Sequence, residues 1–129
     1  MNESVVTTES ILAENNNKEV WAQCLSQIDL TTLNGEDTTE KVATMARKVS
    51  EFPKHFPQLK NVAALCVYPA LAATARENLT VPVGVACVAA GFPASQTFIE
   101  VKVAEAAMAV HAGATEIDIV LSVGKFLEE

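Results

Sequence analysis

Asp118 is the residue whose setting most suggests chemistry, because it interrupts an apolar segment, residues 116–123, directly after a helix-like segment that ends at Gly113. Burial disfavours an ionised carboxylate, so a buried aspartate indicates that a neighbouring group needs its charge or its proton. Alternation along a strand predicts Asp118, Val120 and Ser122 on one face. The alternative is an aspartate at a frayed strand start that bonds the neighbouring backbone, and the spacing alone favours neither interpretation.

The composition and charge of the chain argue against several classes of binding partner and against a membrane span. The chain has 129 residues, half of them hydrophobic, and a net charge of -7 from 16 acidic and 9 basic residues. Without a cluster of lysine and arginine, we expect neither a nucleic acid nor an anionic membrane surface as a partner. No stretch reaches the roughly 18 apolar residues of a membrane span, and the N-terminus does not resemble a secretion signal.

The cysteines indicate a reducing environment. Cys24, Cys66 and Cys87 are odd in number and widely spaced, so neither a disulfide framework nor a metal site such as zinc is predicted. We therefore expect a cytoplasmic protein.

Three asparagines at 15–17 divide the chain into an N-terminal extension, residues 1–17, and one domain, residues 18–129. The domain is predicted to begin with an amphipathic helix over 18–27 that turns Trp21 and Leu25 inward.

The rest of the domain repeats one pattern, in which an apolar run of strand length alternates with a segment of helical spacing. Strands are predicted near 28–33, 62–68, 83–88 and 116–123, and helices over 37–53, 69–79 and 96–112. For the last helix we expect Ser95 as N-cap, Gly113 as C-terminal stop, and a buried stripe of Ile99, Val103, Ala106 and Val110. Buried strands separated by helices predict a parallel α/β sheet with right-handed crossovers.

Four motifs in this order resemble those of the deoxyribose-phosphate aldolases. They are Ile-Asp-Leu-Thr-Thr-Leu-Asn at 28–34, Ala-Ala-Leu-Cys-Val-Tyr-Pro at 63–69, Gly-Phe-Pro at 91–93, and Gly-Ala-Thr-Glu-Ile-Asp-Ile-Val at 113–120. The resemblance implies a class I aldolase on a TIM barrel. Such an enzyme cleaves the phosphosugar 2-deoxyribose 5-phosphate to glyceraldehyde 3-phosphate and acetaldehyde through a lysine Schiff base, with no metal or other cofactor.

The same resemblance implies roles for individual residues. Asp118 matches an aspartate of the proton relay around the Schiff-base lysine, a role that suits a carboxylate next to an amine. Asp29 matches an aspartate that helps to position a second lysine, although it could instead cap the turn before Thr31. Cys66 and Thr31 are expected in the substrate pocket, where Cys66 serves packing first because apolar surroundings raise the pKa of a thiol.

The remaining polar candidates, two lysines and two histidines, are not expected to take part in catalysis. Lys102 is expected to be a solvated charge on a helix, and Lys125 a contact at the rim of the barrel, in the loop after the fourth strand. His55 and His111 lie far apart in sequence and are expected to be structural.

A TIM barrel typically needs eight strands and about 250 residues, so we interpret this sequence as the N-terminal half of one. The resemblance places the Schiff-base lysine, its helper lysine and the phosphate-binding backbone in the other half, which predicts that this chain alone is inactive. One alternative is a doubly wound α/β binding domain without catalysis, and another is one subunit of a split barrel. Because half a barrel leaves apolar surface open, we expect a homodimer or higher oligomer.

Overall fold

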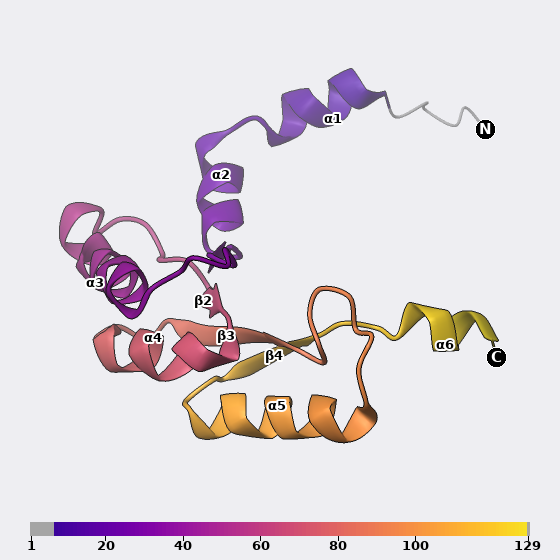
Figure 1. The fold of residues 1–129 in the computed structure, drawn as a ribbon. Helices are drawn as coiled ribbons and strands as arrows, with labels where there is room; N and C mark the ends of the chain where they lie inside the picture. The colour runs from indigo at the N-terminus through magenta and orange to yellow at the C-terminus, as the bar shows by residue number, and fades with distance from the viewer. Residues whose placement is uncertain (1–6, 129) are drawn as a thin grey trace.

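The computed structural model describes residues 7–128, and its core is a parallel sheet with helices between the strands (Figure 1). The strands are β1 (Asp29–Thr31), β2 (Ala64–Val67), β3 (Gly84–Ala89) and β4 (Glu116–Ile119). The helices are α1 (Thr8–Asn15), α2 (Lys18–Leu25), α3 (Thr39–His55), the short 3-10 helix η1 (Pro69–Leu71), α4 (Ala72–Asn78), α5 (Ile99–His111) and α6 (Val123–Glu128). The predicted alternation of strands and helices is therefore confirmed.

The strands lie side by side in the order in which they occur along the chain. The order is β1-β2-β3-β4, and every pair is parallel. A doubly wound domain reverses its strand order at a switch point, whereas a barrel adds each strand to the same side of the previous one. The sequential order contradicts the doubly wound alternative and confirms a partial TIM-barrel fold.

All three helices that connect the strands pack on one face of the sheet. Leu65, Val67, Val85 and Cys87 of the strands form one buried cluster with residues of α3, α4 and α5. A second cluster on the other face contains Ala64, Cys66, Ala86 and Val88, and its members come from strands and from the residues that follow them, not from these helices. In a TIM barrel the helices lie outside the strands, so the second face is the inner face of the incomplete barrel.

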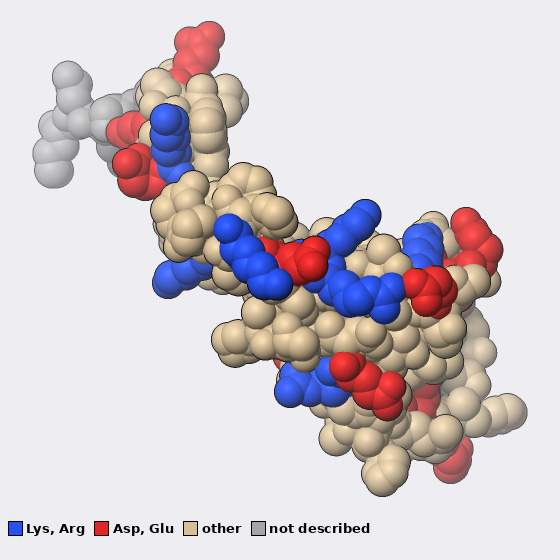
Figure 2. Space-filling view, turned by 90° about the vertical axis from the view of Figure 1, so that its left-hand side faces the viewer, with Lys and Arg blue, Asp and Glu red and all other residues tan. Residues whose placement is uncertain are grey.

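Helix α3 shows how local sequence sets the outer layer. Val42, Ala46 and Val49 recur at helical spacing and are buried against the sheet. The N-cap is Thr38, whose hydroxyl accepts the Lys41 N–H, whereas the neighbouring Asp37 accepts from the preceding loop and pairs with the Lys41 side chain. On the face seen in Figure 2, basic and acidic side chains are interspersed. On α3, Arg47 pairs with Glu40.

Helix α5 differs from its prediction at both its start and its buried face. It begins at Ile99 after Phe98, so Ser95 is not its N-cap, whereas Gly113 is the predicted stop, with a φ of 104°. Its buried residues are Lys102 and Ala109. The predicted stripe was wrong because Ile99, Val103 and Val110 are 56–63% exposed; small side chains, not the largest apolar ones, allow the helix to approach the sheet.

The two N-terminal helices bury no residue, and α1 projects away from the sheet (Figure 1). Asn16 caps the end of α1 and Asn17 the start of α2, so the asparagines do mark a break. The prediction that Trp21 turns inward was wrong, since it is 56% exposed. The division of the chain after residue 17 stays a prediction. None of the helices in the described part of the chain is long and apolar enough to cross a membrane.

Candidate active site

The inner face of the sheet brings the residues selected from the sequence together. Register places Thr31 of β1 beside Cys66 of β2, and Cys66 beside Ala86 of β3. Asp118 of β4 is aligned with Val88, a member of the inner-face cluster. Each of these strands presents its alternate residues to the same side, so side chains distant in sequence line one surface.

Asp118 and Cys66 are in contact although β3 lies between their strands. The Cys66 Sγ is 3.8 Å from the Asp118 Oδ2 and donates its S–H to that oxygen. On β3, Ala86 is aligned with Cys66 and Val88 with Asp118, so the two side chains meet diagonally across this strand. Asp118 therefore points over the inner face, as an inward residue of a barrel strand does.

Burial and the contact with Asp118 both affect the pKa of the Cys66 thiol. Burial and then the Asp118 carboxylate raise the pKa of Cys66, while the Thr31 hydroxyl acts in the opposite direction. A neutral thiol is a poor nucleophile, and Cys66 packs in the inner-face cluster; its place in the substrate pocket stays a prediction.

The prediction that Asp118 is buried was wrong. Asp118 is exposed, and so is its strand neighbour Glu116. Because the Asp118 side chain is exposed, the argument from burial does not apply to it in this chain. Its position on the inner face, not its burial, makes it a candidate.

Asp29 and Thr31 occupy the edge strand β1, whose residues are all exposed. The Thr31 hydroxyl donates to the backbone oxygen of Asp29 at 2.9 Å. The turn-capping alternative for Asp29 receives no support from the hydrogen bonds of the structure, because the carboxylate that organises the β1–α3 loop belongs to Asp37. It accepts from the Thr32 hydroxyl and the Asn34 N–H.

Two aromatic residues stand at the carboxyl ends of β2 and β3, next to these polar groups. Tyr68 and Phe92 pack against the inner-face cluster and meet edge to face with their ring centroids 6.2 Å apart. They give the candidate site an apolar wall at the end of the barrel where TIM-barrel enzymes carry their active sites.

The environment of Lys102 differs from the one predicted from the sequence. This lysine is only 9% exposed, and its Nζ donates to the backbone oxygen of Ser95, to the Ser95 hydroxyl and to the Ser122 hydroxyl. The expectation of a solvated charge was therefore wrong. The small residues Ala106 and Ala109, one and two turns further along α5, were the sequence signal for its buried face.

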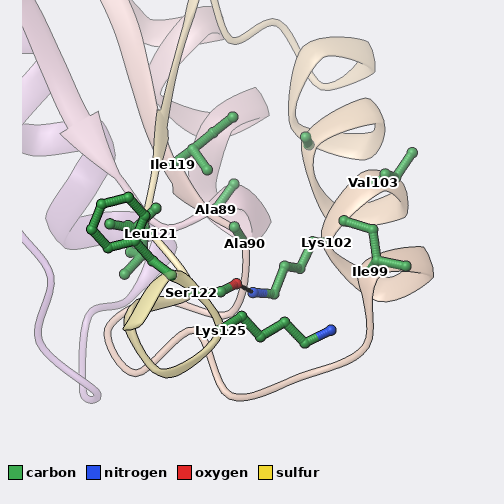
Figure 3. Close-up of a pocket in the computed structure, with 12 residues that line it drawn as sticks. Ala89, Ala90, Ile99, Lys102, Val103, Ile119, Leu121, Ser122 and Lys125 are labelled. Carbon is green, nitrogen blue, oxygen red and sulfur yellow. Dashed lines mark hydrogen bonds between the residues drawn. The ribbon is translucent and has the colours of Figure 1, made fainter. Parts of the chain in front are cut away.

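The remaining candidates lie away from the inner face. Lys125 is on α6, not in a loop, and lines the same end of the molecule as Lys102 (Figure 3). Strand β4 ends at Ile119, so the predicted alternation does not extend to Ser122. His55 and His111 end α3 and α5 and are exposed. Among residues 7–128, no three His, Cys, Asp or Glu side chains form a group that could hold a metal ion.

Proteins similar in sequence to this chain include deoxyribose-phosphate aldolases. The chain is 37% identical over 131 aligned residues to the deoxyribose-phosphate aldolase of Homo sapiens, and 36% identical to that of Bos taurus; each match covers 88% of this chain and 41% of the relative. The chain is homologous to part of the deoxyribose-phosphate aldolases. The family resemblance predicted from the four motifs is thus confirmed, and the chain spans about two fifths of the length of these relatives.

Solved structures agree with the sequence comparison. The tetrameric deoxyribose-phosphate aldolase of Aeropyrum pernix matches with a TM-score of 0.73 and 26% identity, over 93% of this chain and 48% of that one. A protein described as QR15, an aldolase, matches with a TM-score of 0.69 and 29% identity, over 81% of this chain and 42% of that one. A search of family models finds no match.

Proposed function

We propose that this chain is the N-terminal half of a deoxyribose-phosphate aldolase, which cleaves 2-deoxyribose 5-phosphate reversibly to glyceraldehyde 3-phosphate and acetaldehyde through a lysine Schiff base. The observation that supports this most strongly is the position of Asp118. It extends over the inner face of a sequential parallel sheet, 3.8 Å from Cys66, in a chain homologous to these aldolases.

In this proposal Asp118 is the acid and base of the reaction. Schiff-base formation requires loss of water from a carbinolamine, and cleavage requires proton transfer to and from the substrate. An inward carboxylate that is exposed to solvent is suited to exchange these protons. Asp29 positions a lysine from the rest of the barrel, and Cys66 and Thr31 form part of the pocket wall.

Replacing Asp118 tests the role of its carboxylate. In the complete barrel, Asp118→Asn keeps the size and the hydrogen-bonding capacity of the side chain but removes its proton exchange. We expect turnover to fall by roughly two to four orders of magnitude, measured as aldehyde release. Glu116→Gln is the matched control, because Glu116 is a carboxylate on the same strand that makes no contact with Cys66. Unchanged turnover in Asp118→Asn would contradict the role.

We also propose that this chain alone performs no aldol cleavage. Each lysine of residues 7–128 lies on a helix or in a loop, not on a strand. A Schiff-base lysine must approach the substrate that Asp118 serves, and Lys102 instead bonds the serines beside β4.

Chemical trapping tests this second proposal. Acetaldehyde and borohydride are added to the chain, and the lysines are mapped by peptide mass spectrometry. We expect low, evenly distributed labelling of exposed lysines. A stoichiometric adduct at one lysine would overturn the proposal, while leaving the role of Asp118 to be decided by turnover of the complete barrel.

A further inference from the structure

A polar pocket lies outside the candidate active site, between the loop after β3 and the start of α6. Its volume is about 320 Å³. The polar side chains that line it are those of Ser95, Gln96, Thr97, Lys102, Ser122 and Lys125. Two lysines and no carboxylate line this pocket, in a chain with 16 acidic and 9 basic residues. The pocket is therefore a local concentration of positive charge.

The charge of Lys102 is buried without an acidic partner. Its three hydrogen bonds, of 2.8, 2.6 and 2.5 Å, all end on neutral oxygens. The ion pairs among residues 7–128 join Lys41 to Asp37 and Arg47 to Glu40, so neither pocket lysine belongs to one. Glu105, one turn along α5, uses its carboxylate to accept the Gly91 N–H. Neutral oxygens solvate an ammonium ion but leave its net charge in place.

The hydrogen-bond partners of Ser95 and Ser122 leave the hydroxyl of Ser122 available as a donor to a ligand. The Ser95 hydroxyl donates to the Val120 backbone oxygen at 3.0 Å and accepts from Lys102. The Ser122 hydroxyl accepts from Lys102, and its other contact is a long 3.5 Å approach to the Ser95 oxygen. The proton of Ser122, next to an ammonium group, can therefore be donated to a bound acceptor.

Lys125 approaches from the opposite side of the pocket. Figure 3 shows Lys102 extending from α5 toward Ser122, and Lys125 extending from α6 back toward α5. Two ammonium groups from different elements, with the hydroxyl of Ser122 beside one of them, form a set of donors that suits an anion with several oxygens.

We propose that this pocket binds a phosphate group, either free or as the phosphate of a small phosphomonoester. Lys125 and the Ser122 hydroxyl contact the phosphate oxygens, and Lys102 provides the buried charge that holds Ser122 in place. The site lies beside the carboxyl end of β4 on the side where α5 packs, separate from Asp118. The proposal does not depend on aldolase activity.

Calorimetric titration of this 129-residue chain with inorganic phosphate tests the proposal, with sodium chloride keeping the ionic strength constant. We expect saturable binding at one site. Lys125→Met and Ser122→Ala should each weaken it by about tenfold or more, the usual effect of losing a hydrogen bond to a charged group. Lys54→Met, which removes an exposed lysine at the end of α3, is the matched control and should bind as the parent does.

Glycerol 3-phosphate in a second titration distinguishes the two sources of the phosphate group: tighter binding than inorganic phosphate identifies an ester as the preferred ligand, and weaker binding identifies the free ion. Asp118→Asn should bind phosphate as the parent chain does. The absence of saturable binding to either compound, or equal affinities in the parent, Lys125→Met and Ser122→Ala, would overturn the proposal.

Discussion

At the scale of single residues, the environment of a side chain decides between roles that its chemistry leaves open. Asp118 and Lys102 are both charged, and their predicted environments were reversed. The aspartate is exposed on an open inner face, while the lysine is buried among serines. A long flexible side chain can bring its charge to distant oxygens, whereas a short carboxylate remains near its own strand.

The contact between Asp118 and Cys66 predicts a change in thiol reactivity. The carboxylate raises the pKa of Cys66, so Asp118→Asn should lower that pKa and increase the thiolate fraction at a given pH. Alkylation of Cys66 by iodoacetamide near pH 8 should become several-fold faster, measured by mass mapping in a Cys24→Ser background. Glu116→Gln is the control and should leave the rate unchanged. Equal rates in the parent and in Asp118→Asn would show that the carboxylate does not act on the thiol.

At the scale of elements, short-range signals predicted the helices well but misplaced some of their ends. The β1–α3 connection contains two residues that could cap the helix, Asp37 and Thr38. Asp37 pairs with Lys41 and accepts hydrogen bonds from Thr32 and Asn34 of the loop, and these contacts, that with Lys41 first, hold the pKa of its carboxyl far below its ordinary value. Thr38 therefore remains as the cap.

This assignment predicts different effects for two adjacent threonines. Thr38→Ala removes the hydroxyl that accepts the Lys41 N–H at 3.2 Å, and should lower the free energy of unfolding by about 1 kcal/mol. Thr39→Ala, at the first helical position, should change it by less than about 0.5 kcal/mol, because its side chain is exposed and an alanine suits a helix. Urea denaturation measures both values. A larger loss of stability in Thr39→Ala than in Thr38→Ala would show that Thr38 is not the cap.

At the scale of the whole molecule, the described structure leaves apolar surface without a partner. Strands β1 and β4 each pair on one side only. Beside β4, a groove of about 530 Å³ is lined mainly by apolar side chains, together with Lys102, Ser122 and Lys125 (Figure 3). Of its apolar residues, Ile119, Val103 and Phe126 are 62–71% exposed. Burying apolar area gains roughly 25 cal/mol per Å², so covering this surface is strongly favoured over exposing it to water.

We therefore expect the chain to form a homodimer or higher oligomer, with Asp118 at or near the interface. A second copy can pair with the open strand edges and cover both inner faces. Light scattering over a dilution series measures the mass. A cooperatively folded monomer at the lowest concentration would contradict this account. A monomer that assembles only after a different polypeptide is added would instead support the split-barrel alternative.

Features that depend on neighbouring residues were predictable from local sequence patterns. Apolar runs and helical spacing predicted the four strands and the helices between them. The four motifs, including Ile-Asp-Ile-Val around Asp118, indicated the family before any contact was known. The break at Asn15–Asn17 and the stop at Gly113 also followed from local chemistry, because caps and turns depend on residues that are close in the chain.

Which groups meet and which face is covered became clear from the three-dimensional fold alone. Cys66 contacts Asp118 across β3, whose register aligns Ala86 with Cys66 and Val88 with Asp118. Lys102 is buried because the loop after β3 brings Ser95 under α5 and the end of β4 brings Ser122 to the same point. Burial and charge pairing depend on residues far apart in sequence, and no local pattern determines their separation in space.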